Sequence, residues 1–168
     1  MRYLALDPSV MNRAGWATLD VERDADGKLT KEDWNWGCWE INGMNFKMRC
    51  TDLKDFILHD IGHFDMLIGE WPCFYAGQKG EIAARQGWTI NLAGILMYVA
   101  GWFQVTHTQL QLYTAPEWKG TVPKQVTARR FYKLFDINSM NVDHNAIDAT
   151  MLLYFYSQKM CLTSEKAP

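Results

Sequence analysis

The sequence predicts an α/β protein built on a mixed five-stranded sheet, three antiparallel strands followed by two parallel ones, with helices on both faces. Two short apolar runs end in an acidic residue, at Asp7 and Glu70, and such runs are typical of buried strands. An Asp-Gly turn at 24–28 separates two further strand-like segments. Beyond residue 45, apolar residues recur at steps of three and four, which predicts amphipathic helices between the later strands.

The composition indicates a globular protein. With 168 residues, 48% of them hydrophobic, we expect one domain at 1–161 and a frayed polar tail at 162–168. The net charge of −2 argues against nonspecific polyanion binding over the whole surface, although it permits a local basic patch. Without a membrane-length apolar run or a signal-peptide pattern, we expect a cytoplasmic protein. The four cysteines form no CxxC pair, which favours free thiols over structural zinc.

The first half of the chain is expected to form three strands and a helix, at about 2–7, 14–21, 34–41 and 45–61. Pro8 ends the first strand because it has no N–H to donate. The segment 24–28 is a turn, since a calcium loop would need further ligands that are missing. Gly62 is a typical helix stop.

The second half is expected to alternate helix and strand. The predicted elements are a strand at 66–70, a long helix at 80–103, a strand at 109–114, a loop at 116–123, a basic helix at 124–135 and a helix at 143–159. Apolar residues along one face of the last helix favour packing on the sheet.

Four glycines stand seven residues apart in the predicted long helix: Gly80, Gly87, Gly94 and Gly101. Each interior glycine costs a helix about 0.8–1 kcal/mol relative to alanine, so their repetition implies a close approach by another element. One interpretation is tight packing on the sheet of the same domain. The other is a helix–helix seam in a homodimer, since a seven-residue period keeps one face in register.

Three carboxylates occupy comparable positions: Asp7 and Glu70 at strand ends, and Asp148 near the start of the last helix. Burying a lone carboxylate is costly, so each is expected to have a partner. Three carboxylates without a surrounding Cys or His set favour Mg²⁺ or Mn²⁺. The alternative for Asp7 alone is a turn-forming residue before Pro8.

These segments resemble the RNase H-like superfamily, and within it the RuvC-like Holliday junction resolvases, especially the small phage-encoded ones. The matching segments are LALDPS at 4–9 with GWA at 15–17, LIGE at 67–70, WKGTVPK at 118–124 and DHNAIDA at 143–149. The resemblance covers nearly the whole chain. It implies a structure-selective endonuclease that acts on branched DNA as a homodimer and is active in the host cytoplasm if phage-encoded.

The resemblance also implies a catalytic site with two Mg²⁺ or Mn²⁺ ions. Asp7 would bridge both ions, with Glu70 on one side and Asp148 on the other. The family usually has an acid or a His three residues before the last Asp, where this chain has Asn145. His144 lies on the same helix face as Asp148 and is the favoured additional catalytic group. Asp143 is a candidate metal ligand, with an N-cap role as the alternative.

A basic stretch follows the last predicted strand, with no acid between Glu117 and Asp136. It comprises Lys119, Lys124, Arg129, Arg130 and Lys133. It predicts a phosphate-contacting surface beside the metal site, the alternative being a solvated helix face.

Aromatic residues directly follow Glu70. By resemblance, Phe74 or Tyr75 would wedge into the junction centre and stack on bases, while the alternative for them and Trp71 is a cluster facing the core. Lys79 and Arg85, near the start of the predicted long helix, are further candidate phosphate contacts.

Three other functions compete with the resolvase. They are a monomeric RNase H-like nuclease acting on RNA/DNA hybrids or flaps, half of an actin-like or sugar-kinase-like ATPase, and a non-cleaving protein that binds branched DNA. The chain is short for the ATPase and has no second glycine-rich phosphate loop. The three intact carboxylates argue against the non-cleaving protein.

Overall fold

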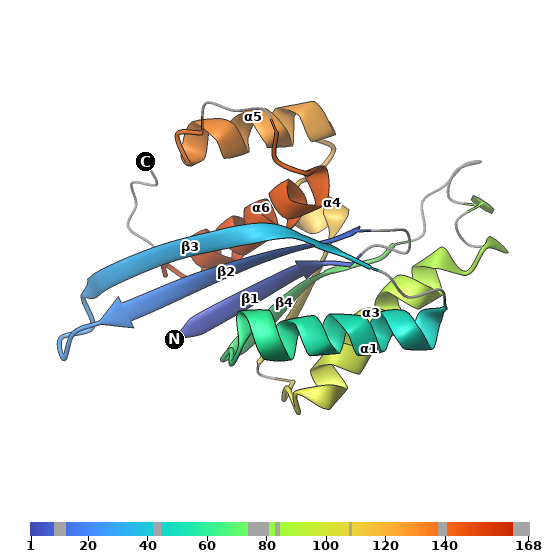
Figure 1. Ribbon diagram of the computed structural model, residues 1–168. Coiled ribbons are helices and arrows are strands. Elements are labelled where there is room, and N and C mark those ends of the chain that lie inside the picture. Colours follow the sequence, from blue (N-terminus) through green and yellow to red (C-terminus); the bar gives the residue numbers. More distant parts are fainter. Residues whose placement is uncertain are drawn as a thin grey trace.

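A computed structural model of the chain describes residues 1–8, 13–41, 45–73, 81–82, 85–107, 109–137 and 141–162. Its centre is a five-stranded sheet with the strand order β3-β2-β1-β4-β5 (Figure 1). The strands are β1 (Arg2–Asp7), β2 (Arg13–Arg23), β3 (Leu29–Glu40), β4 (Met66–Trp71) and β5 (Leu110–Thr114). β1, β2 and β3 pair antiparallel, whereas β1–β4 and β4–β5 pair in parallel. The predicted mixed sheet is confirmed.

Helices cover both faces of the sheet, as Figure 1 shows. The helices are α1 (Phe46–Phe56), continued by the π-helical turn η1 (Ile57–Ile61), α3 (Trp88–Trp102), α4 (Ala115–Trp118), α5 (Lys124–Leu134) and α6 (His144–Lys159). α1 and α3 pack on one face, and α5 and α6 on the other. No described helix is long and apolar enough to cross a membrane.

The central strand β1 is buried on both faces, because successive side chains of a strand point in opposite directions. Tyr3 and Ala5 belong to the core cluster under α5 and α6, whereas Leu4 and Leu6 belong to the cluster under α1 and α3. The same alternation directs the next residue, Asp7, to the face covered by α6.

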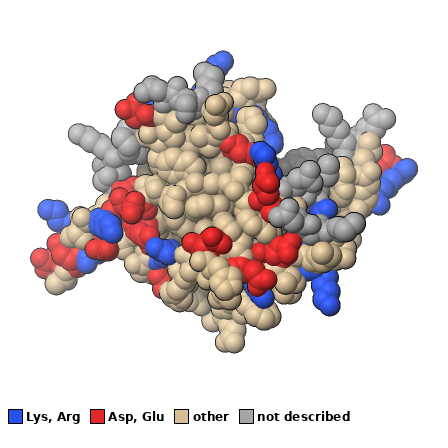
Figure 2. All heavy atoms as spheres, viewed as in Figure 1, with Lys and Arg blue, Asp and Glu red and all other residues tan. Residues whose placement is uncertain are grey.

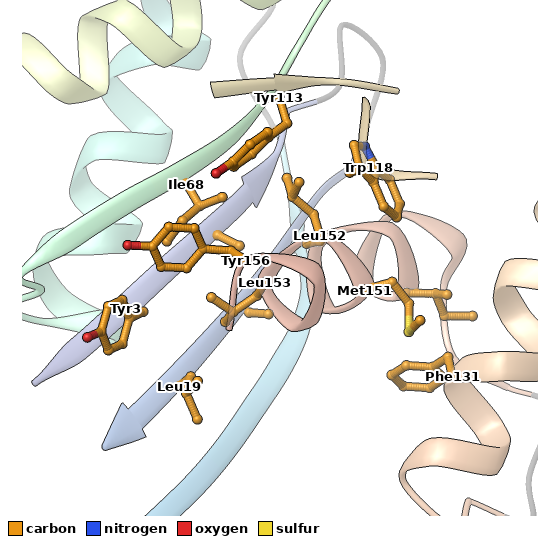
Figure 3. Packing of buried hydrophobic residues seen from close by; sticks show 14 of the residues in the cluster. Tyr3, Leu19, Ile68, Tyr113, Trp118, Phe131, Met151, Leu152, Leu153 and Tyr156 are labelled. Atoms are coloured by element: carbon orange, nitrogen blue, oxygen red, sulfur yellow. The ribbon is translucent and has the colours of Figure 1, made fainter. Parts of the chain in front are cut away.

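The helix α6 anchors the first of these clusters. In Figure 3, Leu152 and Leu153 point from α6 toward the strands, while Met151 points toward Phe131 of α5. Both leucines and Phe131 are fully buried. Because apolar burial contributes about 25 cal/mol per Å², this contact between α6 and the sheet is a main source of stability.

The predicted helix at 80–103 is interrupted rather than continuous: residues 81–82 and 85 are helical, and the Gln86 N–H donates to the Ile82 carbonyl at 3.0 Å. α3 begins only at Trp88, because Gly87 has φ +68°, a left-handed conformation that a continuing α-helix does not contain. A Cβ atom on Gly94 would lie 2.8 Å from the Phe46 ring of α1, whereas one on Gly101 would meet nothing within 4 Å. Close packing within the domain therefore explains Gly94; Gly80 lies outside the described residues.

The loop predicted at 116–123 is wrong at its beginning, where the short helix α4 follows β5 directly. Glu117 accepts hydrogen bonds from the Thr114 N–H and hydroxyl, at 2.6 and 2.8 Å, and Pro116 lies in the first turn. This is a capping box with a helix-initiating proline.

The other predicted elements are present, with shifted ends. β3 begins at Leu29 rather than near 34, and the turn at 24–28 is held by hydrogen bonds from two backbone N–H groups to the Asp24 carboxylate. Leu162, expected in the tail, donates to the Ser157 carbonyl at 2.9 Å and packs against the core. The rest of that tail, 163–168, lies outside the described residues.

Candidate active site

Two of the candidate carboxylates lie at the same edge of the sheet. β1 and β4 run in parallel with Leu6 opposite Gly69, so Asp7 and Glu70 come next on neighbouring strands. Both follow the side-chain alternation toward α6, since Ala5 and Ile68 belong to the cluster on that face.

Asp148 completes the group from the second turn of α6, where its side chain is almost completely buried. Burial of Asp7 and the negative charges of Glu70 and Asp148 raise the pKa of Asp7 well above its usual range. Lys119 and Lys124 oppose this rise in pKa. The three carboxylates thus share one electrostatic site.

Lys119 is the cation that this site holds. Its Nζ lies 3.4 Å from Oε2 of Glu70 and 3.3 Å from Oδ2 of Asp148. Burial lowers the pKa of Lys119, but the two carboxylates outweigh burial and the net pKa is raised. Lys124 Nζ stands 4.0 Å from the same oxygen of Asp148, and its side chain is exposed.

Trp118 holds the carboxylate of Glu70 in place by a hydrogen bond. Its indole Nε1 donates a hydrogen bond to Oε2 of Glu70 at 2.8 Å, and the Lys119 ammonium lies 4.5 Å from the centre of the Trp118 ring system. Both residues come from the end of α4, so the capping box at 114–117 positions them over Glu70. Sequence reasoning missed the role of Trp118; the Thr-x-x-Glu signature at 114–117 indicates the start of α4 but not the contact with Glu70.

The donor set suits a hard divalent cation, because Mg²⁺ and Mn²⁺ prefer carboxylate oxygens. Among the described side chains, however, no three Asp, Glu, His or Cys residues are already arranged to hold a metal ion. The ammonium of Lys119 contacts two of the three carboxylates instead, and so shows that the site stabilises positive charge. By the chemistry of their side chains, Asp7, Glu70 and Asp148 are the residues of this site that could hold such an ion.

Neighbouring candidate residues at the start of α6 have different structural roles. Asp143 is the N-cap, accepting from the Asn145 N–H at 2.9 Å, and it also pairs with Arg13 at 3.1 Å. Although burial raises the pKa of Asp143, hydrogen bonds from Asn145, Cys38 and Arg13 lower it below its usual value. The predicted N-cap is therefore confirmed. His144 begins α6 as an exposed residue.

A glycine holds α6 against the sheet. Gly15 lies opposite Asp7 on β2, and a Cβ atom there would stand 1.9 Å from the carbonyl oxygen of Asn145. The Asn145 side chain adds a hydrogen bond from Nδ2 to the Arg13 carbonyl at 2.9 Å. This close approach sets the depth of Asp148 relative to the strand ends.

The predicted basic residues divide into two groups. Lys119 and Lys124 reach the carboxylates, whereas Arg129, Arg130 and Lys133 are exposed on α5. On the face drawn in Figure 2, acidic and basic side chains are interspersed around a broad neutral area. The cations at the carboxylates are thus a local feature rather than part of a surface-wide positive field.

Some predicted DNA contacts lie outside the described residues, namely Phe74, Tyr75 and Lys79. Trp71 is partly buried against the cluster under α1 and α3. Arg85 is exposed and pairs with Glu81 at 2.5 Å.

Neither models of protein families nor curated proteins match the sequence. Solved structures do. The chain resembles RuvC of Thermus thermophilus in complex with a Holliday junction substrate, with a TM-score of 0.60, 18% identity, and coverage of 95% of this chain and 96% of that one. A second Thermus thermophilus RuvC structure aligns with a TM-score of 0.58, 17% identity, and coverage of 96% and 98%.

The chain has a RuvC-like, RNase H-like fold. The fold expected from the resemblance is confirmed, since the likeness extends over nearly the full length of both chains. At 18% identity it establishes the fold alone, so activity has to be argued from the site.

Proposed function

We propose that this protein is a Mg²⁺- or Mn²⁺-dependent endonuclease that resolves four-way or other branched DNA by paired nicks. The observation that carries the proposal is the convergence of Asp7, Glu70 and Asp148, beside Lys119, at one edge of a RuvC-like sheet. Carboxylates delivered by separate elements can hold the metal ions that activate water and stabilise the leaving oxygen in phosphodiester hydrolysis. The Thermus thermophilus RuvC bound to a Holliday junction supports branched DNA as the substrate.

Asp7, Glu70 and Asp148 would together hold the divalent ions. When bound, such ions activate a water and stabilise the leaving 3′-oxygen during in-line attack on phosphorus. The chain's own residues prepare the site: Trp118 fixes one Glu70 oxygen, and the buried position of Asp148 keeps its side chain in place. Lys119, released from the carboxylates, would bind a phosphate oxygen beside the scissile bond.

His144 is proposed as the additional catalytic group. It lies four residues before Asp148 and therefore on the same face of α6, and its side chain is exposed to a substrate. Asp143 remains a possible ligand by position, but its N-cap bond and its pair with Arg13 favour a structural role.

The exposed cations of α5, with Lys124, are proposed to bind the DNA backbone. Phosphate contacts position a nucleic acid and do not read its sequence, so selectivity would come from branch shape and deformability. Phe74 and Tyr75 stay proposed as the aromatic pair that enters the junction centre.

We further propose a homodimer, because two symmetric nicks need two sites and a two-fold dimer supplies them. Large apolar side chains are exposed on α3 and α1, among them Ile90 at 72%, Met97 at 48%, Phe46 and Met48. Ile90 and Met97 are seven residues apart and share one helix face. An exposed apolar face of this kind favours a protein partner, and a second copy supplies a matching one.

The segment 118–124, which resembles a loop of phage relatives, supports a phage-encoded protein that works in the cytoplasm of its host. The phage origin rests on this sequence resemblance, whereas the proposed activity rests on the three carboxylates.

A cleavage assay tests the function. A labelled four-way junction, a flap, an RNA/DNA hybrid and a linear duplex are each incubated with Mg²⁺ or with EDTA, beside the Asp7→Asn variant. We expect paired symmetric nicks in the junction, absent in EDTA and in the variant. Cleavage of hybrids or flaps alone would favour a monomeric RNase H-like nuclease over the resolvase. Tight junction binding without any cleavage would indicate a non-cleaving protein that binds branched DNA.

A further inference from the structure

A cavity of about 430 Å³ opens between α5 and α6, and none of the three carboxylates lines it. Its walls are mostly apolar and aromatic, formed by Leu134 of α5, Met151, Tyr154 and Phe155 of α6, and Trp118 of α4. The volume lies within the roughly 300–1,000 Å³ typical of small-molecule sites. Flat aromatic and apolar walls of this kind suit a planar ring.

One polar atom at this cavity is unpaired. The Thr127 side chain lines the cavity and is only 3% exposed, and among the described residues its hydroxyl is the buried side-chain polar group without a hydrogen-bond partner. A buried hydroxyl without a partner destabilises the protein, and a polar ligand that bonds to it would offset this cost. The cavity therefore favours a ligand with a polar edge as well as an apolar face.

The charged residues at the cavity are all cations. Lys119, Arg130 and Lys133 line it, and none of its described lining residues is acidic. Charge complementarity thus calls for an anionic group attached to the planar ring. A nucleotide has this combination: a base with polar edges and an attached phosphate.

The cavity is continuous with the proposed catalytic site, because Trp118 and Lys119 belong to both. A ligand beside these residues would lie next to the carboxylates. The occupant is therefore argued to be part of the DNA substrate rather than a free metabolite.

We propose that the cavity takes up one unpaired nucleotide of the DNA, with its base between the aromatic walls and its phosphate toward Arg130 and Lys133. The Thr127 hydroxyl forms a hydrogen bond with a polar edge of the base. The inference rests on the proposed function and deepens it. For enzymes that extrude a base from the helix, the free-energy cost of unstacking and unpairing is lowest where the base is already unpaired. Base pairs at a branch point lack the continuous stacking of an intact duplex and open at a lower cost, so the cavity would add selectivity for branches.

A binding experiment in EDTA tests the inference without cleavage. The DNA is a duplex carrying one unpaired 2-aminopurine, and its partner is the same DNA with an abasic site at that position. We expect the protein to quench 2-aminopurine emission and to bind the base-bearing DNA about 5- to 150-fold more tightly, since bases stack favourably on aromatic side chains. Thr127→Val should reduce this preference about 3- to 10-fold.

Two further variants separate the cavity from general effects. Arg129→Ala, on the same helix but outside the cavity, should weaken both DNAs equally and leave the preference unchanged. Met151→Trp, which fills the cavity, should abolish the quenching. Thr127→Val should keep or raise Tm, because it removes an unsatisfied hydroxyl, so a binding defect there would not reflect unfolding.

Equal affinity of the wild type for base-bearing and abasic DNA, or a preference unaffected by both Thr127→Val and Met151→Trp, would overturn the inference. Either result would leave junction cleavage in Mg²⁺ standing. Conversely, a base preference in a protein that cuts no substrate would remove the proposed nuclease and keep the nucleotide site.

Discussion

Asp7 carries an energetic cost in the metal-free protein that a divalent ion would relieve. Burial and two neighbouring carboxylates disfavour its charged form, while of the three carboxylates Lys119 pairs directly with Glu70 and Asp148. At catalytic sites, groups are often held in arrangements that the fold alone would not select. The stability of the metal-free protein is therefore a direct test of the proposed role.

Asp7→Asn should stabilise the metal-free protein while removing cleavage. Since the folded state holds the Asp7 proton more tightly than the unfolded state, stability falls as pH rises from about 3.9 through the raised pKa. The neutral amide removes that loss at pH 7. We expect a higher Tm in EDTA, by about 2–4 °C for each kcal/mol gained, measured by calorimetry.

Asp20→Asn is the matched control for this substitution. The Asp20 carboxylate pairs with Arg2 at 2.8 Å, and the hydrogen bond from Arg2 lowers the pKa of Asp20. Its loss should reduce Tm at pH 7 slightly, opposite in sign to Asp7→Asn. A lower Tm for Asp7→Asn in EDTA would contradict the strained-carboxylate interpretation.

Lys119→Met should destabilise the metal-free protein and strengthen metal binding. The ammonium is the direct counter-charge of Glu70 and Asp148, so its removal should cost roughly 1–3 kcal/mol in EDTA. Mn²⁺ would no longer compete with the Lys119 ammonium for the carboxylates, and titration calorimetry should show that Mn²⁺ binds more tightly. Lys124→Met is the control, since an exposed pair at 4.0 Å contributes about 0–1 kcal/mol. Unchanged Mn²⁺ affinity in Lys119→Met would refute the competition.

At the scale of elements, the sequence predicts the sheet well because strand patterns and turn residues are local. The continuous apolar run before Asp7 and the Asp-Gly turn are sufficient to predict the antiparallel part, and the apolar run before Glu70 predicts the parallel part. The sequence does not predict the break before α3, because a glycine at helical spacing can lie inside a helix or end one. Gly87, with its left-handed backbone conformation, ends one. The role of Trp118 depends on tertiary placement of α4 over Glu70, which no local pattern specifies.

Gly15→Ala should disable the site through α6. The added methyl would overlap the Asn145 carbonyl, so the start of α6 must move away from β2 and carry Asp148 with it. We expect a lower Tm and at least a tenfold loss of junction cleavage, because small misplacements of catalytic groups are costly. Gly37→Ala on β3 is the control, since its methyl meets only the Trp16 side chain, at 3.0 Å. Full activity in Gly15→Ala would show that Asp148 is not positioned by this contact.

At the scale of the whole molecule, the two faces of the sheet have different surroundings. The face under α5 and α6 carries the carboxylates and the cations, whereas α1 and α3 cover the other face and expose apolar side chains to solvent. This division places the proposed dimer surface away from the cavity between α5 and α6. DNA binding and self-association can then be altered separately.

Ile90→Glu combined with Met97→Glu should convert the proposed dimer into a monomer. Each substitution places a charge on the exposed apolar face of α3, and central interface residues commonly contribute 2 kcal/mol or more, about 30-fold in Kd. Sedimentation equilibrium should show a dimer for the wild type and a monomer for the double variant. Met160→Glu, an exposed apolar position at the end of α6, should leave the dimer intact. The monomer should still cut one strand of a junction but lose the pairing of the two nicks, because Asp7, Glu70 and Asp148 of each proposed site come from one chain. A wild type that is monomeric at all concentrations, yet nicks both strands together, would refute the two-fold arrangement.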